Sequence, residues 1–289
     1  MKDSYLIELI EYTDPYCTWC WGSEPTLRKI EEAYGDQIKI SFKMGGLVKD
    51  MDSFSDPANG IGGSSWYAQV AAHWLEASTR HGMPVDEQIF FDVKDSRFST
   101  HPANIAYKAA QFQGEFIANR YLRRMREGVA AERKDIQKLD IQTELASDVG
   151  LNTERFVADM KSGKANEAFE MDLKECRDKG IRGFPSYGIR NINDNEEFLV
   201  RGFRRFSEFQ DLFLKASGAP LRPVSLSASM SSILAFVKKY EKVAEKEIAE
   251  VFDLSEERTD EYLTPLVSDG KLSKRKAGNG FFIVPINDC

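Results

Sequence analysis

The chain has 289 residues, a length that suggests about two domains as a prior. Hydrophobic residues make up 42% of it and aromatic residues 11%, a composition that excludes a disordered, collagen-like or coiled-coil protein. The net charge of −7 disfavours partners rich in phosphate, such as nucleic acids and anionic membranes. No apolar run approaches the roughly 20 residues that a membrane-spanning helix needs.

The N-terminal segment predicts a β-α-β unit. Residues 5–12 are apolar and strand-prone, so we expect a buried strand there. Asp14-Pro15 offers a capping acid followed by a proline, and it predicts the start of a helix that ends at Gly35. Residues 38–44 alternate between apolar and polar side chains and predict a second strand, parallel to the first.

The rest of the first 218 residues predicts an α/β core that is interrupted by helices. Residues 54–165 show helical patterns with few strand signals and predict an all-helical insertion. After the insertion, strand patterns at 186–190 and 197–201 flank a turn-rich segment and predict a hairpin, followed by a helix over 207–216. The predicted core therefore consists of residues 1–53 and 166–218.

The C-terminal segment, residues 224–289, follows a linker rich in glycine and proline. It predicts three short helices and a hairpin, at 231–240, 245–252, 255–268 and 272–284. This pattern resembles a winged helix-turn-helix domain. However, residues 231–289 carry 9 basic and 11 acidic side chains, and the third helix is acidic, so DNA binding is disfavoured and a structural or protein-contact role is favoured.

The N-terminus and the cysteine count indicate a cytoplasmic protein. Acidic residues interrupt the short apolar run that follows Met1, so no secretory signal is recognisable. Four cysteines, Cys17, Cys20, Cys176 and Cys289, are too few for a disulfide scaffold, which a reducing compartment would not maintain.

Cys17-Thr18-Trp19-Cys20 is the motif that predicts chemistry. It lies between a strand and a helix of a β-α-β unit, the context in which C-x-x-C indicates a redox pair. A sulfur at a helix start meets unpaired N–H groups that favour the thiolate. We therefore expect Cys17 to be an exposed nucleophile and Cys20 to be a more buried resolving cysteine. A zinc site is the alternative, but it needs two further ligands, and only Cys176 and Cys289 remain, far apart in the sequence.

Gly183-Phe184-Pro185-Ser186-Tyr187 places a proline directly before a predicted strand. The bond before Pro185 is a candidate cis peptide, because cis proline costs only about 0.5–1 kcal/mol over trans. A cis bond would turn the adjacent backbone outward, where it could pair with an extended substrate. An ordinary trans proline at the start of an edge strand is the alternative.

The segment Asp14–Trp21, the helical insertion and the Phe184-Pro185 segment together resemble the DsbA-like thioredoxin superfamily, in particular its FrnE-like branch without a signal peptide. The resemblance covers about residues 4–216 and implies a thioredoxin-like core. It also implies that Cys17 is the nucleophile, that Cys20 resolves and that the cis proline Pro185 lies beside the active site. The dipeptide Thr-Trp lacks the histidine of strongly oxidising DsbA proteins, which favours a reductase or isomerase.

The sequence therefore predicts a cytoplasmic thiol–disulfide oxidoreductase that acts on a disulfide-containing protein or a small-molecule thiol, with glutathione as a candidate co-substrate and neither metal nor organic cofactor. The alternative is a non-enzymatic, redox-sensing adaptor that acts through its C-terminal domain. A homodimer is left open. We expect substrate contacts from an apolar rim around the cysteines, namely Tyr16, Trp19, Trp21 and Phe184. For Trp19 and Trp21, packing on the insertion is the equal alternative. Asp14 is predicted to be a helix cap, and His101 and Cys176 to be structural.

Overall fold

The computed structural model describes residues 5–193, 196–218 and 221–286. Its central sheet has four strands in the order β2-β1-β5-β6, with bounds Ile38–Met44, Ile7–Thr13, Ser186–Asn191 and Glu197–Arg201. β1 runs parallel to β2, with Ile7 opposite Ile38, and antiparallel to β5, which pairs antiparallel with β6. The mixed α/β fold with a thioredoxin-like sheet is confirmed.

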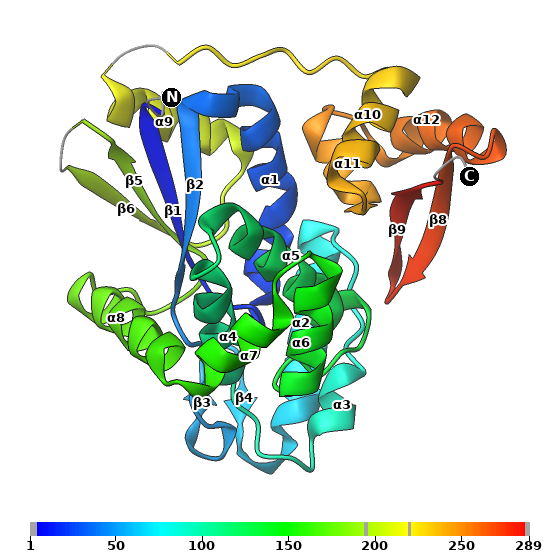
Figure 1. The fold of residues 1–289 in the computed structure, drawn as a ribbon. Helices are drawn as coiled ribbons and strands as arrows, with labels where there is room; N and C mark the ends of the chain where they lie inside the picture. Colours follow the sequence, from blue (N-terminus) through cyan, green and yellow to red (C-terminus); the bar gives the residue numbers. More distant parts are fainter. Residues whose placement is uncertain (1–4, 194–195, 219–220, 287–289) are drawn as a thin grey trace.

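Helices cover both faces of this sheet (Figure 1). On one face, α1 (Thr18–Tyr34) and α9 (Phe206–Ser217) pack on β2, β1 and β5. On the other face, α8 (Lys164–Asp178) packs on β2. Because β1 lies between two strands and two helical layers, each of its seven residues is buried. This central position brings the end of β1, and the chain that follows it, to the middle of the fold.

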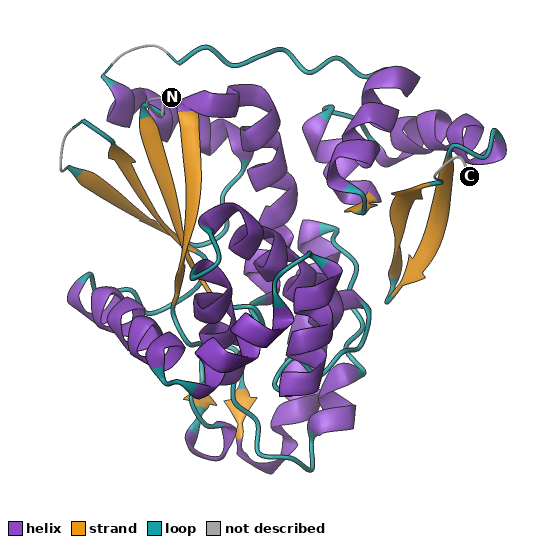
Figure 2. Cartoon of the chain, in the orientation of Figure 1, coloured by secondary structure: helices purple, strands orange, loops and turns teal. Residues whose placement is uncertain are grey.

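The segment between β2 and β5 is mostly helical (Figure 2). Its helices before α8 are α2 (Trp66–His81), α3 (Ile89–Val93), α4 (His101–Gln111), α5 (Glu115–Ala131), α6 (Leu139–Asp148) and α7 (Thr153–Lys161). A two-stranded ladder, β3 (Ser55–Asp56) with β4 (Ile61–Gly62), is a small addition to the predicted helices. Buried side chains of these helices join those of the sheet and α1 in one hydrophobic cluster.

Residues 230–286, called the C-terminal unit below, form three helices and a three-stranded sheet. The helices are α10 (Met230–Tyr240), α11 (Glu245–Val251) and α12 (Glu256–Ser268). The strands β7 (Val243–Ala244), β8 (Leu272–Ala277) and β9 (Gly280–Pro285) pair in the order β7-β9-β8. The unit has its own hydrophobic cluster. The three helices and the β8–β9 hairpin match the predicted elements within one or two residues, whereas the short strand β7 was not predicted. The winged-helix assignment and the domain boundaries stay predictions.

The C-terminal unit packs on the helix that begins after Cys17, since α11 lies along α1 (Figure 1). Ion pairs surround this contact, and the C-terminal unit supplies the acidic partner in some of them and the basic partner in others. Two of them involve non-glycine residues with a left-handed backbone: Asp253 (φ 53°) pairs with Lys29, and Glu241 (φ 62°) pairs with Arg120. Such a backbone is unfavourable for side chains other than glycine, so these two carboxylates are held at a local cost.

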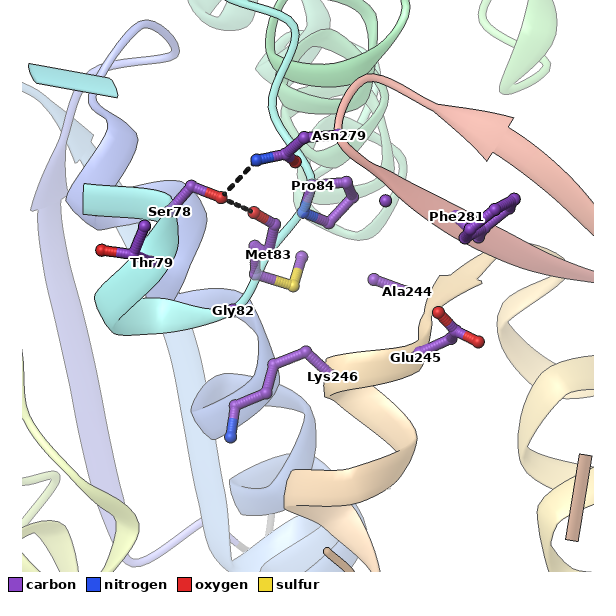
Figure 3. A pocket seen from close by; sticks show the side chains of 11 residues that line it. Ser78, Thr79, Gly82, Met83, Pro84, Ala244, Glu245, Lys246, Asn279 and Phe281 are labelled. Atoms are coloured by element: carbon purple, nitrogen blue, oxygen red, sulfur yellow. Dashed lines mark hydrogen bonds between the residues drawn. The ribbon is translucent and has the colours of Figure 1, made fainter. Parts of the chain in front are cut away.

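The turn between β8 and β9 contacts the insertion. Asn279 exchanges hydrogen bonds with the backbone of Val85, and its amide donates to Ser78 (Figure 3). A Cβ on Gly278 (φ +49°) would lie 2.2 Å from the Val85 carbonyl oxygen, so only glycine fits here. A pocket of about 210 Å³ lies along this junction. Among the described residues, no helix is both long and apolar enough to cross a bilayer.

Candidate thiol–disulfide site

Cys17 is the N-cap residue of α1 and Cys20 lies in its first turn. The Cys17 sulfur accepts a hydrogen bond from the Cys20 N–H at 3.2 Å. Both cysteines are free thiols, with 5% of Cys17 and 0% of Cys20 exposed. The expected order of burial is confirmed, but the expectation of an exposed Cys17 is wrong, because its side chain is almost completely buried. The Cys17 sulfur lies at the start of the helix, where the motif predicts it.

Asp14 is not the helix cap that the Asp-Pro pattern predicts. Its buried carboxylate accepts hydrogen bonds from the backbone N–H groups of Tyr16 and Leu47 and from the side chains of Thr100 and Asn104, at 2.6–2.8 Å. Burial raises the pKa of Asp14, although these four donors oppose the shift. The residue ties the loop before Cys17 to the loop after β2 and to α4.

The Phe184–Pro185 peptide bond is cis, as predicted. Pro185 is buried and its carbonyl oxygen accepts from the N–H of Gly202. The half-buried Phe184 ring lies where a Cβ of Gly45 would be, with its ζ carbon 1.9 Å from that position. Gly45 directly follows β2, so this loop and the proline segment can approach closely only because residue 45 is glycine.

Trp19, inside the motif, is half-buried and has two aromatic neighbours. Its ring centroid lies 5.9 Å from that of Phe203, which follows β6, and 5.9 Å from that of His81, at the end of α2. Sequence reasoning missed Phe203, which no local pattern marks. Trp19 and Phe203 form an apolar wall close to the cysteines, so Trp19 stays a predicted substrate contact.

His81 is a second residue that sequence reasoning missed. Its Nε2 lies 3.3 Å from Oγ1 of Thr18, the residue after Cys17, and its Nδ1 accepts from the N–H of Met83 at 3.1 Å. Since Nδ1 is an acceptor, the neutral ring carries its proton on Nε2 and donates it to Thr18. Burial lowers the pKa of His81 to about 4. The ring therefore contributes a hydrogen bond, and not a positive charge, at neutral pH.

Buried charges lie on the interior side of Cys20. Arg126 of α5 donates to Glu24 of α1 at 2.5 Å and to Glu11 of β1 at 2.9 Å, and Glu11 and Arg126 are both fully buried. Burial raises the pKa of Glu11 to about 7, against the attraction of Arg126. Burial opposes ionisation of Glu24 too, but Arg126 and Arg123 outweigh it and lower the pKa of Glu24 to about 2.

The Cys20 thiol is shaped by this environment. Burial raises its pKa well above the ordinary value, and the hydrogen bond and charge of Cys17 add to the shift. Glu11 acts in the same direction and Arg126 in the opposite one. Sequence reasoning missed this cluster. The sequence does contain a signal for it. Arg126 stands four residues after Leu122 and three before Val129, so helical spacing places this charged residue on the buried face of α5.

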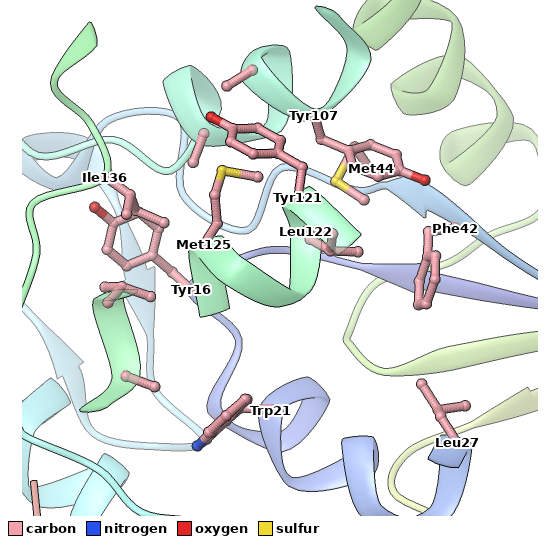
Figure 4. Packing of buried hydrophobic residues seen from close by; sticks show 14 of the residues in the cluster. Tyr16, Trp21, Leu27, Phe42, Met44, Tyr107, Tyr121, Leu122, Met125 and Ile136 are labelled. Carbon is pink, nitrogen blue, oxygen red and sulfur yellow. The ribbon is translucent and has the colours of Figure 1, made fainter. Parts of the chain in front are cut away.

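Two predicted substrate contacts, Trp21 and Tyr16, point into the fold (Figure 4). Trp21 is 1% exposed, donates from Nε1 to the Pro84 carbonyl and meets the ring of Phe282 on β9. Tyr16 is 4% exposed and packs edge-to-face on Phe98 of the insertion. A substrate cannot reach either ring in this structure, because the insertion and the C-terminal unit cover them.

Two further candidate residues, His101 and Cys176, have other neighbours. The His101 ring packs on Phe169. Cys176 of α8 is buried beside Tyr12, and burial raises its pKa to about 12. Cys289 lies outside the described residues. Among those residues, no three His, Cys, Asp or Glu side chains are grouped as metal ligands.

Solved structures with a similar fold include the cytosolic disulfide reductase DsbM of Pseudomonas aeruginosa and a candidate disulfide isomerase of Nitrosomonas europaea. The first is 20% identical, with a TM-score of 0.56, and the match covers 72% of this chain and 98% of that one. The second is 21% identical, with a TM-score of 0.60, and the match covers 73% and 98%. At these identities the likeness concerns the fold.

Curated relatives match over more of the chain. The ClpXP adapter protein SpxH of Halalkalibacterium halodurans is 29% identical over 268 residues, which cover 92% of this chain and 84% of that protein. SpxH of Bacillus subtilis is 26% identical over 281 residues, which cover 96% and 88%. A family model described as thioredoxin matches residues 11–211. This match contains the cysteine pair, the insertion and the cis proline, and the chain therefore belongs to the thioredoxin family.

Proposed function

We propose that the protein is a thiol–disulfide oxidoreductase of the reductase or isomerase type. The observation that carries the proposal is the position of the Cys17 sulfur, which caps α1 and accepts the Cys20 N–H at 3.2 Å. The resolving thiol thus belongs to the same helical turn as the nucleophile. The similar folds of a cytosolic disulfide reductase and of a candidate disulfide isomerase support the proposal.

In the proposed reaction, the Cys17 thiolate attacks one sulfur of a substrate disulfide. The substrate S–S bond breaks, a mixed disulfide forms with Cys17, and the released sulfur takes up a proton. Cys20 then loses its proton and attacks the Cys17 sulfur, which releases the second substrate thiol. The proton that Cys20 loses balances the charge of the departing substrate sulfur, which leaves as a thiol. Two electrons pass to the substrate and leave a Cys17–Cys20 disulfide. Two molecules of an external thiol such as glutathione reduce this disulfide and are themselves joined in a disulfide.

The substrate side of the site is apolar and partly backbone. Trp19 and Phe203 form one wall, and the half-buried Phe184 contributes a further ring. These groups suit an extended peptide with apolar residues next to its disulfide. A cytoplasmic location and a disulfide-containing protein or glutathione mixed disulfide as substrate belong to the same proposal.

Turnover of insulin or of a glutathione mixed disulfide tests the activity. We expect Cys17→Ser to abolish turnover, and Cys20→Ser to trap a mixed disulfide through Cys17. Cys176→Ser is the matched control, since it removes a buried thiol of another helix and should leave the rate unchanged. Equal rates for the wild type and Cys17→Ser would refute the proposed enzyme.

A second candidate function is that of an adaptor for a partner protein, in which the C-terminal unit takes part. The favouring observation is that the relatives named ClpXP adapter match over 92–96% of this chain, so that their match reaches the C-terminal unit. Binding to ClpXP from Bacillus subtilis, measured with the full chain, tests this candidate. Retained binding by a Cys17→Ser/Cys20→Ser variant that has lost turnover would make the cysteine pair dispensable for it, whereas no binding by either form would refute it.

A further inference from the structure

A continuous chain of buried ion pairs leads from the C-terminal unit toward the thiol site. Glu247 of α11 is 0% exposed and accepts two hydrogen bonds from Arg123, from Nη1 and Nη2, each at 2.8 Å. Arg123 also donates to Glu24 at 3.2 Å, and Glu24 accepts from Arg126 at 2.5 Å. Arg126 donates in turn to Glu11 at 2.9 Å. The chain therefore joins α11, α5, α1 and β1.

Within this chain, the carboxylate of Glu24 is shared by two arginines. Arg123 and Arg126 lie three residues apart on α5 and reach different oxygens of Glu24. Both Nη atoms of Arg123 donate to Glu247, so Arg123 attracts Glu24 less strongly. Glu24 can therefore stay paired with Arg126. The C-terminal unit thus supplies Arg123 with a carboxylate in addition to Glu24 and Glu127. Glu247 also lies 3.5 Å from Nε of Arg28 on α1.

A second contact connects the same elements. Trp21, which directly follows Cys20, has the Arg123 guanidinium 4.7 Å from its ring centroid on one side and Phe282 of β9 as an edge-to-face neighbour. A movement of the C-terminal unit would therefore displace both a ring next to Cys20 and the arginine that shares Glu24.

We propose that Glu247 is a positioning residue of the thiol site: by holding Arg123 it leaves Glu24 to Arg126, and so fixes the charge that Arg126 and Glu11 present to Cys20. This inference rests on the proposed oxidoreductase function. According to this inference, the C-terminal unit influences the chemistry of the thiol site through Glu247. The charged and titratable groups that face Cys20 come from α1, β1, α5 and β5, namely Cys17, Glu11, Arg126 and Tyr187.

The direction of the effect follows from the charge balance. Replacing Glu247 by a neutral residue leaves one more positive charge in a buried cluster. Positive charge favours ionised carboxylates and thiolates over their protonated forms. The dithiol state contains the Cys17 thiolate of the proposed reaction, whereas Cys20, whose pKa burial raises, keeps its proton. The dithiol state is then stabilised relative to the disulfide. Coupling of this kind is reciprocal, so oxidation of the cysteine pair would change the docking of the C-terminal unit by the same free energy.

Glu247→Gln in the full chain tests the inference, because glutamine keeps the shape and retains an oxygen for the Ala244 N–H that Glu247 now accepts. The measurement is the thiol–disulfide equilibrium of Cys17 and Cys20 with glutathione, from pH 5 to 9, in a background without other cysteines. At pH 7 we expect the constant for oxidation to fall by about two- to tenfold. When the constant is plotted against pH, we expect the wild-type curve to bend near pH 7, where Glu11 titrates. In the variant this bend should move to lower pH.

Glu250→Gln is the matched control, since Glu250 lies on the same helix and pairs with Lys246 near the surface. It should leave the constant and the bend unchanged. An unchanged curve for a folded Glu247→Gln variant would overturn the inference while leaving the proposed function intact. A wild type that forms no Cys17–Cys20 disulfide at any glutathione ratio would instead refute the proposed function and, with it, the inference.

Glu127→Gln provides a second test if Glu247→Gln does not fold. Glu127 accepts from Nε of Arg123 at 2.8 Å and lies on α5, within the insertion. Its replacement removes a negative charge from the same arginine while Glu247 stays in place, although it also removes the ion pair of Glu127 with Lys242 of the C-terminal unit at 2.8 Å. The same downward shift of the constant is expected, and its absence would overturn the inference.

Discussion

Replacing Glu11 by glutamine tests the electrostatic description of the buried cluster. The carboxylate is 0% exposed and its pKa rises from 4.5 to about 7. Between these two pH values, the folded state keeps a proton that the unfolded state has lost, so the free energy of unfolding falls as the pH rises. With 1.36 kcal/mol per pKa unit, the loss amounts to about 3 kcal/mol. Glutamine does not titrate, so the variant lacks this loss.

Urea unfolding of both proteins, at several pH values from 4.5 to 8 and under constant reductant, measures the difference. The wild-type stability minus that of Glu11→Gln should fall by about 3 kcal/mol across this range. The neutral amide oxygen of glutamine is a weaker acceptor for Arg126 than the carboxylate, which adds a roughly constant offset of about 1–3 kcal/mol. The exposed Glu76→Gln is the control. Parallel curves, or a difference that grows with pH, would show that Arg126 outweighs burial and would refute the reasoning.

Three further predictions concern the contacts around the site. Trp21→Ala should lower the free energy of unfolding by about 3–5 kcal/mol, measured in urea, and an effect below 1 kcal/mol would mean that Trp21 is not a core residue. Gly278→Ala should cost more than Gly270→Ala, because both have positive φ but only the first would meet the backbone of Val85, and equal costs in urea would contradict the contact. The wild-type stability minus that of a His81→Gln variant should fall as the pH drops from 6.5 toward 4, because the unfolded state protonates His81 first; a difference that stays constant with pH would contradict this.

Local periodicity explains what the sequence predicted well. The strand predicted over 38–44 is observed at Ile38–Met44, because alternation along a single strand is enough to define it. The three helices and the hairpin of the C-terminal unit were likewise predicted from local patterns and turn residues. The cis proline and the cysteine pair followed from short motifs in an ordered context, and neither needed knowledge of distant contacts.

Long-range contacts explain what the sequence could not predict. Asp14 has the local signature of a helix cap, yet donors from Leu47, Thr100 and Asn104 take up its carboxylate, so Cys17 becomes the cap instead. Trp21 lies on a buried face of α1, but helical spacing does not say which element covers that face. In the structure it is β9, more than 250 residues further along the chain.

The left-handed backbones of Asp253 and Glu241 bear on how the molecule is held together as a whole. Glycine at either position would relax the C-terminal unit taken by itself, but it would remove a carboxylate that binds Lys29 or Arg120 across the junction. The unit thus gives up some of its own stability in favour of assembly with the rest of the chain. If the protein is cut at the 218–223 linker, the unfavourable backbone conformations remain, but the ion pairs across the junction are lost. Each separate piece is therefore expected to be less stable than its own hydrophobic cluster suggests.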